Sequence, residues 1–439
     1  MINKIKKFIL VLGDVLVLYV SLYLALFLRY AGNFEIELWQ EHLLPFTVVY
    51  LIWIFIFYLA GLYSPQIAQN NYKFYSTTLK AISISAFVAI GIFYITFVIA
   101  PKTVLVINIL IFLALFVLWR QLYNNIVKST LIKNVLFLGE SKEAKELADI
   151  LNSNPQFGYK VKNITNDTKE IDLADFIKKE SIHIVVHAKE ATREENFSGV
   201  LYFLIPLGIT VYDLPRFYAD VTKKVPVSII GRTWFLENLL EVEKGVYETL
   251  KRMFDVVFAI ILGVIALPFF PFIILAISIS SKGEAFYTQT RLGKNEKIIK
   301  ILKFRTMVRE AEKHGVQWTK DRDERVTKVG NFLRRMRIDE LPQLWNVVRG
   351  DLSFIGPRPE RPEFTKTLEE QIPHYQIRHL IRPGLTGWAQ INQPLGNASV
   401  KDSTEKLQYD LYYVKNRSLV LDLDILAKTI MIVLKREGH

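Results

Sequence analysis

The sequence contains no cysteine, which excludes disulfide bonds, cysteine-ligated zinc and iron–sulfur clusters and leaves the redox compartment undefined. It also lacks a small-residue cleavage site after its first apolar run, so that run is not a cleavable signal of the usual form. Acidic residues are outnumbered by basic ones, and the net charge is +12. Such a balance suits anionic lipid headgroups, phosphate-bearing substrates or nucleic acid. The long apolar stretches argue against nucleic acid, so we expect no nucleic-acid partner.

Long apolar stretches fill the first third of the chain. Hydrophobic residues make up 51% of the sequence and charged residues 22%, which indicates membrane segments joined to soluble parts. Each stretch has about the 20 residues that a helix needs to cross a bilayer. A four-helix transmembrane region is therefore predicted for residues 1–125, with spans at Phe8–Leu28, Leu44–Leu62, Ala81–Ala100 and Thr103–Trp119.

The charges around these stretches predict their orientation. Lysine and arginine lie before the first span, between the second and third, and after the fourth, whereas glutamates follow the first span. By the positive-inside rule, both ends of the bundle face the cytoplasm. Asp14 lies inside the first span, where a carboxylate serves either as a polar contact between helices or as a functional group in the membrane. The sequence leaves both interpretations open.

Residues 134–240 have the pattern of a Rossmann-like α/β domain. A helix at Ser141–Asn154, with Ser141 as its N-cap, follows a short apolar strand. The strands are predicted at Asn134–Gly139, His183–His187 and Ile209–Tyr212.

The phosphate-binding loop of this domain is degenerate. Gly139, Ser141 and Ala144 stand where dinucleotide-binding proteins need three glycines, and glycine is what lets the backbone approach a pyrophosphate. Dinucleotide binding is therefore disfavoured. His183 and His187 lie about 13 Å apart on a strand, too far to share a metal ion, so both are interpreted as structural.

A fifth apolar stretch, residues 254–280, differs from the first four. Pro268 and Pro271 lie in its middle, and proline kinks or breaks a helix. Basic residues flank both ends, so a straight span would place a basic domain outside the cell, against the charge rule. A re-entrant helix hairpin that enters and leaves on the cytoplasmic face satisfies both observations. The alternative is an ordinary fifth span with a kink.

The remaining chain, residues 245–439 including that hairpin, is predicted to be a mainly α catalytic domain. Its last segment, Leu419–Leu434, has apolar residues at helical spacing. Such a helix either lies on the membrane surface or packs on the domain core.

Two adjacent acids, Asp339 and Glu340, are the first candidates for chemistry. Pro342 is tolerated only in the first turn of a helix and Gly350 suits its end, so a short helix is expected to begin near Asp339. The positive end of a helix attracts phosphate. Adjacent helical residues point about 100° apart, so one acid would attack phosphorus while the other held a divalent cation. The alternative role for Asp339 is that of an N-cap only.

Basic motifs surround the acids. One precedes them at Lys303–Met307, and another, with Arg334, leads directly into them. Two arginines, Arg358 and Arg382, lie in proline-stiffened loops, which lower the entropy lost when a guanidinium binds a ligand. Because arginine binds phosphate through paired hydrogen bonds, the set predicts a diphosphate site.

Seven motifs follow one another in order across about residues 245–435. They are Lys251-Arg252-x-Phe254-Asp255, Gln289-x-Arg291-x-Gly293, Lys303-Phe304-Arg305-Thr306-Met307, Asp339-Glu340-Leu341-Pro342-Gln343-Leu344, Gly350-Asp351-Leu352-Ser353, Gly356-Pro357-Arg358-Pro359 and Pro383-Gly384-Leu385-Thr386-Gly387. Together they resemble the bacterial sugar transferase family, the monotopic polyprenyl-phosphate phosphoglycosyl transferases. The four spans and the degenerate nucleotide-binding-like domain resemble the layout of the large members of that family.

The resemblance implies an enzyme that transfers a sugar 1-phosphate from a UDP-sugar to undecaprenyl phosphate and releases UMP, the first membrane step of exopolysaccharide, capsule or O-antigen synthesis. Asp339 would form the covalent phosphosugar intermediate, and Glu340 would hold Mg²⁺. The active site would face the cytoplasm at the bacterial inner membrane, and a homodimer is left open. The implied residues are catalytic Lys303 and Arg358, phosphate-binding Arg305, Arg334, Arg358 and Arg382, and a hairpin anchor of Lys251, Arg252, Asp255 and Pro268.

Two other functions are weighed against this one. A membrane-bound nucleotide-sugar dehydratase or epimerase would need an intact glycine loop and a Tyr-x-x-x-Lys pair; Tyr247 and Lys251 have that spacing but lie at the mouth of the hairpin. A membrane scaffold for polysaccharide machinery would not need Asp339, Glu340 and Arg358 together.

Overall fold

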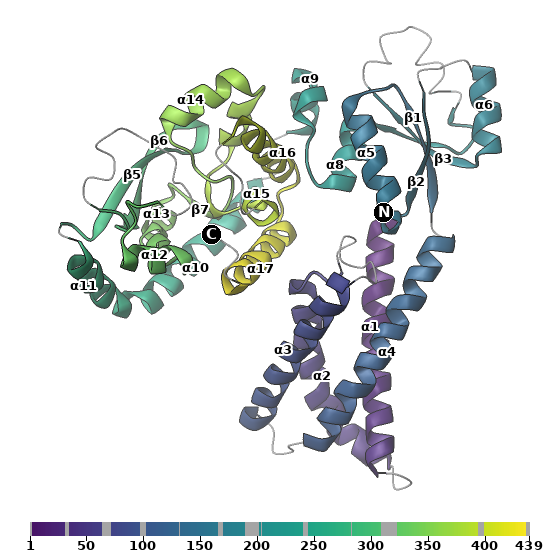
Figure 1. Ribbon diagram of the computed structural model, residues 1–439, viewed down its shortest axis with the longest axis horizontal. Helices are drawn as coiled ribbons and strands as arrows, with labels where there is room; N and C mark the ends of the chain where they lie inside the picture. Colours follow the sequence, from purple (N-terminus) through teal and green to yellow (C-terminus); the bar gives the residue numbers. More distant parts are fainter. Residues whose placement is uncertain are drawn as a thin grey trace. The chain divides into compact units, whose positions relative to one another are not determined.

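The computed structural model describes residues 2–30, 35–63, 72–96, 102–130, 132–165, 170–188, 202, 204–239, 245–281, 283–308, 323–393 and 399–435. Within it the chain forms two compact units, Met1–Leu214 and Pro215–His439 (Figure 1). Lys282, at one end of the predicted hairpin, lies outside the described residues.

The first unit begins with four long helices, which confirms the four apolar helices predicted from the sequence. Each contains a segment long and apolar enough to cross a membrane. A helix satisfies its own backbone hydrogen bonds, which is what a segment in lipid requires. The helices are α1 (Ile2–Tyr30), α2 (Ile36–Leu59), α3 (Tyr72–Thr96) and α4 (Lys102–Thr130).

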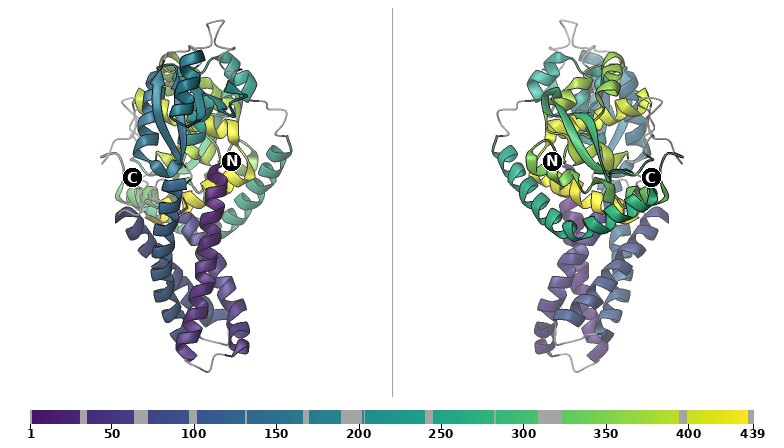
Figure 2. Two further views of the ribbon diagram at one scale, coloured as in Figure 1. Left: turned by 90° about the vertical axis from the view of Figure 1, so that its right-hand side faces the viewer. Right: turned by 90° about the vertical axis from the view of Figure 1, so that its left-hand side faces the viewer.

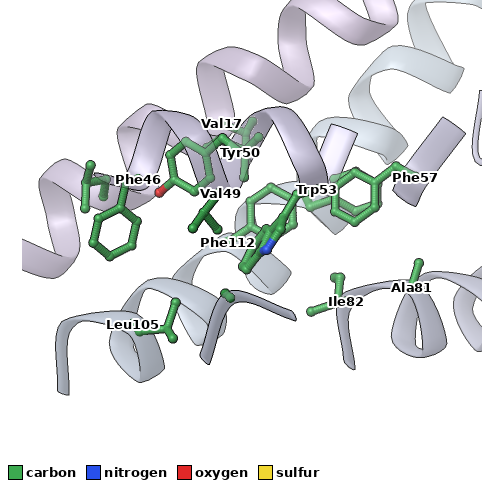
Figure 3. Packing of buried hydrophobic residues seen from close by; sticks show 14 of the residues in the cluster. Val17, Phe46, Val49, Tyr50, Trp53, Phe57, Ala81, Ile82, Leu105 and Phe112 are labelled. Carbon is green, nitrogen blue, oxygen red and sulfur yellow. The ribbon is translucent and has the colours of Figure 1, made fainter. Parts of the chain in front are cut away.

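Aromatic side chains pack the interior of this bundle. Trp53 and Phe57 on α2 meet Phe112 on α4, and the two phenylalanine rings are stacked with centroids 5.8 Å apart (Figure 3). Asp14 on α1 pairs with Arg120 on α4 at 2.6 Å, and both side chains are almost fully buried. The Asp14 carboxylate is thus a polar contact between helices, as the first of its two interpretations predicts.

The α/β part of the first unit contains a parallel four-stranded sheet in the order β2-β1-β3-β4. The side chain of Ser141 caps α5 by accepting a hydrogen bond from the Ala144 N–H, which confirms the predicted N-cap. The three predicted strands are present as β1, β3 and β4, whereas the specifically Rossmann-like topology stays a prediction. The elements are β1 (Lys133–Leu138), α5 (Lys142–Ser153), η1 (Pro155–Phe157), β2 (Tyr159–Thr165), α6 (Glu170–Lys179), β3 (Ile182–His187) and β4 (Thr210–Asp213).

The second unit is mainly helical, with two small sheets. One sheet is the antiparallel pair β5–β6, and the other is the parallel pair β7–β8. Its elements after the hairpin are β5 (Phe286–Leu292), η6 (Lys294–Glu296), β6 (Ile298–Phe304), α12 (Lys328–Arg335), η7 (Ile338–Glu340), α13 (Gln343–Arg349), β7 (Ser353–Ile355), α14 (Pro362–Gln371), η8 (Tyr375–Leu380), β8 (Gly384–Thr386), α15 (Trp388–Asn392), α16 (Val400–Asn416) and α17 (Leu419–Lys435).

Residues that the sequence pattern assigns to the α/β domain pack in the second unit. Leu214–Thr222 forms α8, Val227–Ile229 forms η3 and Arg232–Asn238 forms α9. Val225 and Trp234 share a hydrophobic cluster with Tyr375, Leu407 and Leu411 of the catalytic region. The segment after β4 thus lines the core of the second unit.

The fifth apolar stretch folds as two helical arms with a break between them. Helix α10 (Gly245–Ala266) runs into a 3-10 turn, η5 (Leu267–Phe269), and then into α11 (Phe270–Ser280). Figure 2 shows this bend. Prolines in and just after the turn account for it, because proline removes a helical hydrogen bond.

Both arms return to the core of the same unit. Ala259 on α10 packs with Ile299 and Leu344, whereas Ile277 on α11 packs with Phe304 and Leu333. Most other side chains of the two arms are exposed and apolar, and the stretch is the fifth segment suited to lipid by length and composition.

The C-terminal helix α17 packs one face on the domain core. Ile425 and Asp422 are buried there, whereas Val420, Leu423 and Ile430 remain exposed. The core-packed interpretation of this segment therefore holds for one face of the helix.

Candidate active site

The two adjacent acids lie on a short 3-10 turn, not on the α-helix that we predicted. Arg337 precedes the turn with a left-handed φ of 57°, which separates α12 from η7. The α-helix begins only at Gln343 and ends, as predicted, at a left-handed glycine, Gly350. Leu341 and Pro342, between η7 and α13, keep right-handed helical backbone angles, so the helical path does begin next to Asp339, as predicted, with a 3-10 first turn. The left-handed Arg337 marks the start of this path.

Three cations surround the Glu340 carboxylate. Its Oε1 atom accepts a hydrogen bond from Arg358 Nη2 at 2.9 Å and lies 3.5 Å from Lys303 Nζ and 3.6 Å from Arg337 Nη1. Burial alone would raise the pKa of Glu340, but these cations outweigh it and hold the pKa well below its usual range. Glu340 is therefore ionised and its charge is more than balanced.

The neighbouring Asp339 has the opposite environment. Its side chain is 8% exposed, and within the described ranges its carboxylate forms no hydrogen bond and no ion pair. Burial and the nearby Glu340 raise the pKa of Asp339 above its ordinary value, whereas Lys303, Arg334 and Arg337 lower it. The Asp339 carboxylate can therefore react with a substrate, whereas the Glu340 carboxylate is held by its ion pairs with three cations.

Separate elements supply these cations. Lys303 comes from β6, where burial lowers its pKa, and Arg358 comes from the loop after β7. Arg334 lies on α12, where its Nε donates a hydrogen bond to Thr306 Oγ1 at 2.8 Å. Lys303 and Arg358 thus come from separate elements, whereas Arg334 lies five residues before Asp339 on the preceding helix.

A close backbone approach fixes α12 against the end of β6. A Cβ atom added to Gly330 would lie 2.0 Å from the carbonyl oxygen of Thr306. The same oxygen accepts a hydrogen bond from the Thr327 N–H at 3.0 Å. Only glycine allows this contact, which holds α12 against Thr306, the residue whose side chain accepts the hydrogen bond from Arg334.

Two predicted phosphate-binding arginines lie apart from this cluster. Arg305 donates a hydrogen bond to the carbonyl of Ser281 at the end of α11. Arg382 lines a pocket with Lys251 and Asp255 at the base of the hairpin. Arg334 lowers the pKa of Asp339 and Arg358 that of Glu340, so these two are the predicted arginines that act on the acids most strongly.

The predicted anchor residues tie α10 to the core of the second unit. Lys251 Nζ lies 2.9 Å from Asp422 on α17, and Arg252 donates to the carbonyls of Val347 and Val348. The Asp255 carboxylate accepts from the Phe354 N–H. Pro268 lies in η5, in the break between the two arms.

Two arginines near the acids were missed in the sequence. Arg337 borders Glu340 only because of its left-handed backbone, which no sequence pattern reports. Arg291 on β5 lies near Arg358 and Lys303, and burial lowers its pKa to about 10. The motif Gln289-x-Arg291-x-Gly293 was a usable signal for it.

The acids fit a Mg²⁺ ion that binds together with a substrate. Among the described residues no three His, Asp or Glu side chains converge. Mg²⁺, however, commonly takes one or two carboxylates and completes its shell with water and substrate phosphates. Because Glu340 already faces three cations, a dication beside it is electrostatically favourable only when a diphosphate adds negative charge.

Sequence comparison finds a matching family model and several similar proteins. A family model described as bacterial sugar transferase matches residues 246–436. The chain is 41% identical over 235 residues to a UDP-N-acetylgalactosamine-undecaprenyl-phosphate N-acetylgalactosaminephosphotransferase of Aeromonas hydrophila, a match that covers 52% of this chain and 53% of that protein.

Two further relatives are both named UDP-glucose:undecaprenyl-phosphate glucose-1-phosphate transferase. The Escherichia coli protein is 42% identical over 188 residues, covering 42% of this chain and 40% of its own length. The Klebsiella pneumoniae protein is 30% identical over 315 residues, covering 68% and 67%. The match to the Aeromonas and Escherichia proteins thus spans about half of their length or less.

Proposed function

The chain belongs to the bacterial sugar transferase family, and on this basis we propose that it transfers a sugar 1-phosphate from a UDP-sugar to undecaprenyl phosphate and releases UMP. The two substrates are those named for the similar proteins. The observation that carries the proposal is the contrast between the two acids. Asp339 is buried and without a hydrogen-bond partner among the described residues, whereas Glu340 is neutralised by three cations.

The proposed reaction proceeds in two displacements. In the first, a carboxylate oxygen of Asp339 attacks the β-phosphorus, the bond from that phosphorus to the bridging oxygen breaks, and UMP leaves with the electron pair. The phosphosugar remains on Asp339 as an acyl phosphate. In the second, an oxygen of undecaprenyl phosphate attacks the same phosphorus, and the Asp339 carboxylate is released. Two half-reactions of this kind give ping-pong kinetics.

The cations have distinct roles in this scheme. Lys303 and Arg358 would neutralise charge on the phosphoryl oxygens as UMP departs, which is the main task of a protein in phosphoryl transfer. Arg334 would keep Asp339 ionised and bind the same diphosphate. Arg305 and Arg382, which lie apart from the acids, are proposed to bind phosphate only at the lipid side of the site.

Glu340 is proposed to hold Mg²⁺ once the diphosphate has bound. The ion would supply positive charge to the phosphate oxygens at that point. Residues of the chain itself perform the attack and hold the cations in place. Glu340 in turn fixes the guanidinium of Arg358 and the ammonium of Lys303 through its Oε1 atom, so both cations are held in place before substrate arrives.

The hairpin is proposed to enter the cytoplasmic leaflet and return without crossing the bilayer. Helix α11 has 11 residues, or about 16 Å at 1.5 Å per residue. The hydrocarbon core is about 30 Å thick, so α11 alone is too short to span it. The two arms also pack on two hydrophobic clusters of the same unit, which supports an entry and an exit on the same side.

Topology can be tested with one engineered thiol because the chain has no cysteine. Glu284→Cys places a thiol on an exposed residue just after α11. We expect a membrane-impermeant maleimide to label it in inside-out vesicles but not in intact cells. Labelling of intact cells would replace the re-entrant hairpin with a kinked fifth span.

The activity is tested by incubating membranes with a panel of radiolabelled UDP-sugars. Lipid-extractable label together with released UMP supports the transferase, whereas a dehydratase or epimerase changes the sugar without lipid label, and a scaffold gives neither. We expect Asp339→Asn to abolish both products. If Asp339→Asn retained full activity, the nucleophile would have to be another group.

A further inference from the structure

A buried ion pair lies behind the loop that carries Arg358. Arg378 on η8 and Asp410 on α16 lie 2.8 Å apart, with exposed fractions of 5% and 1%. Arg378 also donates a hydrogen bond to the hydroxyl of Tyr375. Among the described residues neither charged residue forms a hydrogen bond or ion pair with the two acids of the site.

The guanidinium of Arg378 reaches the active-site loop through one atom. Its Nη2 donates a hydrogen bond to the backbone carbonyl of Arg358 at 3.0 Å. The Arg358 side chain in turn donates to Glu340 Oε1 at 2.9 Å. A continuous chain of contacts therefore runs from Asp410 through Arg378 and the Arg358 backbone to Glu340.

The loop that carries Arg358 is tied to its neighbours on both sides of this residue. Before it, the Gly356 N–H donates to the Thr386 carbonyl at 2.9 Å and the Pro357 carbonyl accepts from the Gly384 N–H at 3.0 Å; after it, the Glu360 carbonyl accepts from the Leu292 N–H at 3.0 Å. Between these ties, the prolines on both sides of Arg358 lack N–H groups. The carbonyl of Arg358 itself is held by Arg378.

The chemistry of the pair also suits a positioning role. Replacing a buried ion pair with apolar residues of similar size is often neutral or favourable for stability, so such a pair is weak evidence for stabilisation alone. Arginine, with several donors in one rigid plane, can contact a carboxylate, a hydroxyl and a carbonyl together. That is the set of partners around Arg378.

We propose that Arg378 is a positioning residue of the transferase, which fixes the backbone of Arg358 so that its guanidinium meets Glu340 and the substrate phosphates, and that Asp410 holds Arg378 in that orientation. This inference rests on the proposed function. A misplacement of about 1 Å in a group that contacts the transition state lowers turnover by about 100-fold. Loss of the contact therefore lowers kcat, with little effect on binding of the uridine part of the substrate.

The test is the double replacement Arg378→Met with Asp410→Leu in the full chain, reconstituted in lipid nanodiscs. It removes the hydrogen bond to Arg358 without leaving a buried charge. We expect an apparent Tm close to that of the unmodified protein, a kcat for UMP release lowered at least about tenfold, and a KM for the UDP-sugar within about twofold. A double variant with normal Tm and normal kcat would overturn the proposal.

A matched control removes another ion pair from the same helix. Lys224→Met with Glu405→Leu deletes the pair between Lys224, which follows α8, and Glu405 on α16; among the described residues this pair has no hydrogen bond to the Arg358 loop, and the kcat of the variant should stay within about twofold of the unmodified value. An equal loss of kcat in this control would also overturn the proposal, because the effect would then be one of general packing.

If the double variant fails to fold, Arg378→Lys tests the positioning role of Arg378 instead. Lysine keeps the charge beside Asp410 but cannot reach all three partners, so kcat should fall to an intermediate value while the Tm is nearly kept. A wild-type kcat in this variant counts against the positioning role. Failure of the proposed function looks different: the unmodified protein itself would release no UMP from any UDP-sugar.

Discussion

Replacing Gly330 with alanine should destabilise the protein, although the same change usually stabilises a helix. Glycine inside a helix is about 0.5–1 kcal/mol less favourable than alanine. Gly330 lies in α12, so helix propensity alone predicts a gain. The structure predicts the opposite sign, because the new Cβ would lie 2.0 Å from the carbonyl oxygen of Thr306.

The expected loss of unfolding free energy follows from how far α12 must move away from the end of β6. A normal contact needs more than about 3 Å, so α12 and the end of β6 must separate by about 1 Å, and overpacking of this kind costs about 1–3 kcal/mol. The hydrogen bond from the Thr327 N–H to the same oxygen would be weakened, adding about 0.5–1.5 kcal/mol. After subtracting the helix-propensity gain, we expect a net loss of about 1–3 kcal/mol.

The measurement is thermal unfolding of the full chain in nanodiscs, followed by intrinsic fluorescence. For a unit of this size the loss corresponds to a fall in Tm of about 3–10 °C. Gly263→Ala on α10 is the control, because a Cβ there meets no atom within 4 Å, and it should leave the Tm unchanged or raise it slightly. A higher Tm for Gly330→Ala would refute the reasoning, since the close approach would then be absent in solution.

Four further outcomes are expected. Burial raises the pKa of Asp339 above 3.8, so kcat/KM should fall as the pH drops through an acid limb above about pH 4, and Arg334→Gln should move that limb to higher pH in a pH–rate profile. EDTA should abolish UMP release and excess Mg²⁺ restore it; full activity in EDTA would remove the metal from the scheme. Arg358→Gln should lower kcat/KM at least about 100-fold, because it removes a preorganised donor to the charge that develops on the phosphoryl oxygens. Asp14→Asn should destabilise the bundle by about 3–5 kcal/mol, seen as a lower Tm, because it leaves the Arg120 cation buried without its carboxylate partner.

Local patterns were enough to predict many elements of the fold. The four apolar helices and the cap at Ser141 follow from composition and from residues within one turn of each other, and the structure contains them. The bend at Pro268 is likewise a local property of proline. Such features need no knowledge of distant contacts.

The site depended on contacts that sequence spacing does not report. The predicted helical start near Asp339 is a 3-10 turn, and the left-handed backbone of Arg337 before it is a feature that no sequence pattern reports. Arg305 and Arg358 both lie in basic or proline-rich motifs, yet one points to the end of α11 and the other to Glu340. Arg378 and Asp410 meet across separate elements, and no local pattern pairs them.

Insertion of the hairpin into a single leaflet has a consequence for the bilayer itself. A hairpin confined to one leaflet, as proposed, adds cross-sectional area to that leaflet and none to the other. The two leaflets then differ in area, which favours curvature. Its exposed side chains near the bend, Leu267, Phe269 and Phe272 among them, are bulky and apolar. Insertion then does work against the lateral pressure of a single leaflet, and shallow insertion of this kind is sensitive to curvature and lipid packing. The protein should accordingly partition toward strongly curved or loosely packed membrane.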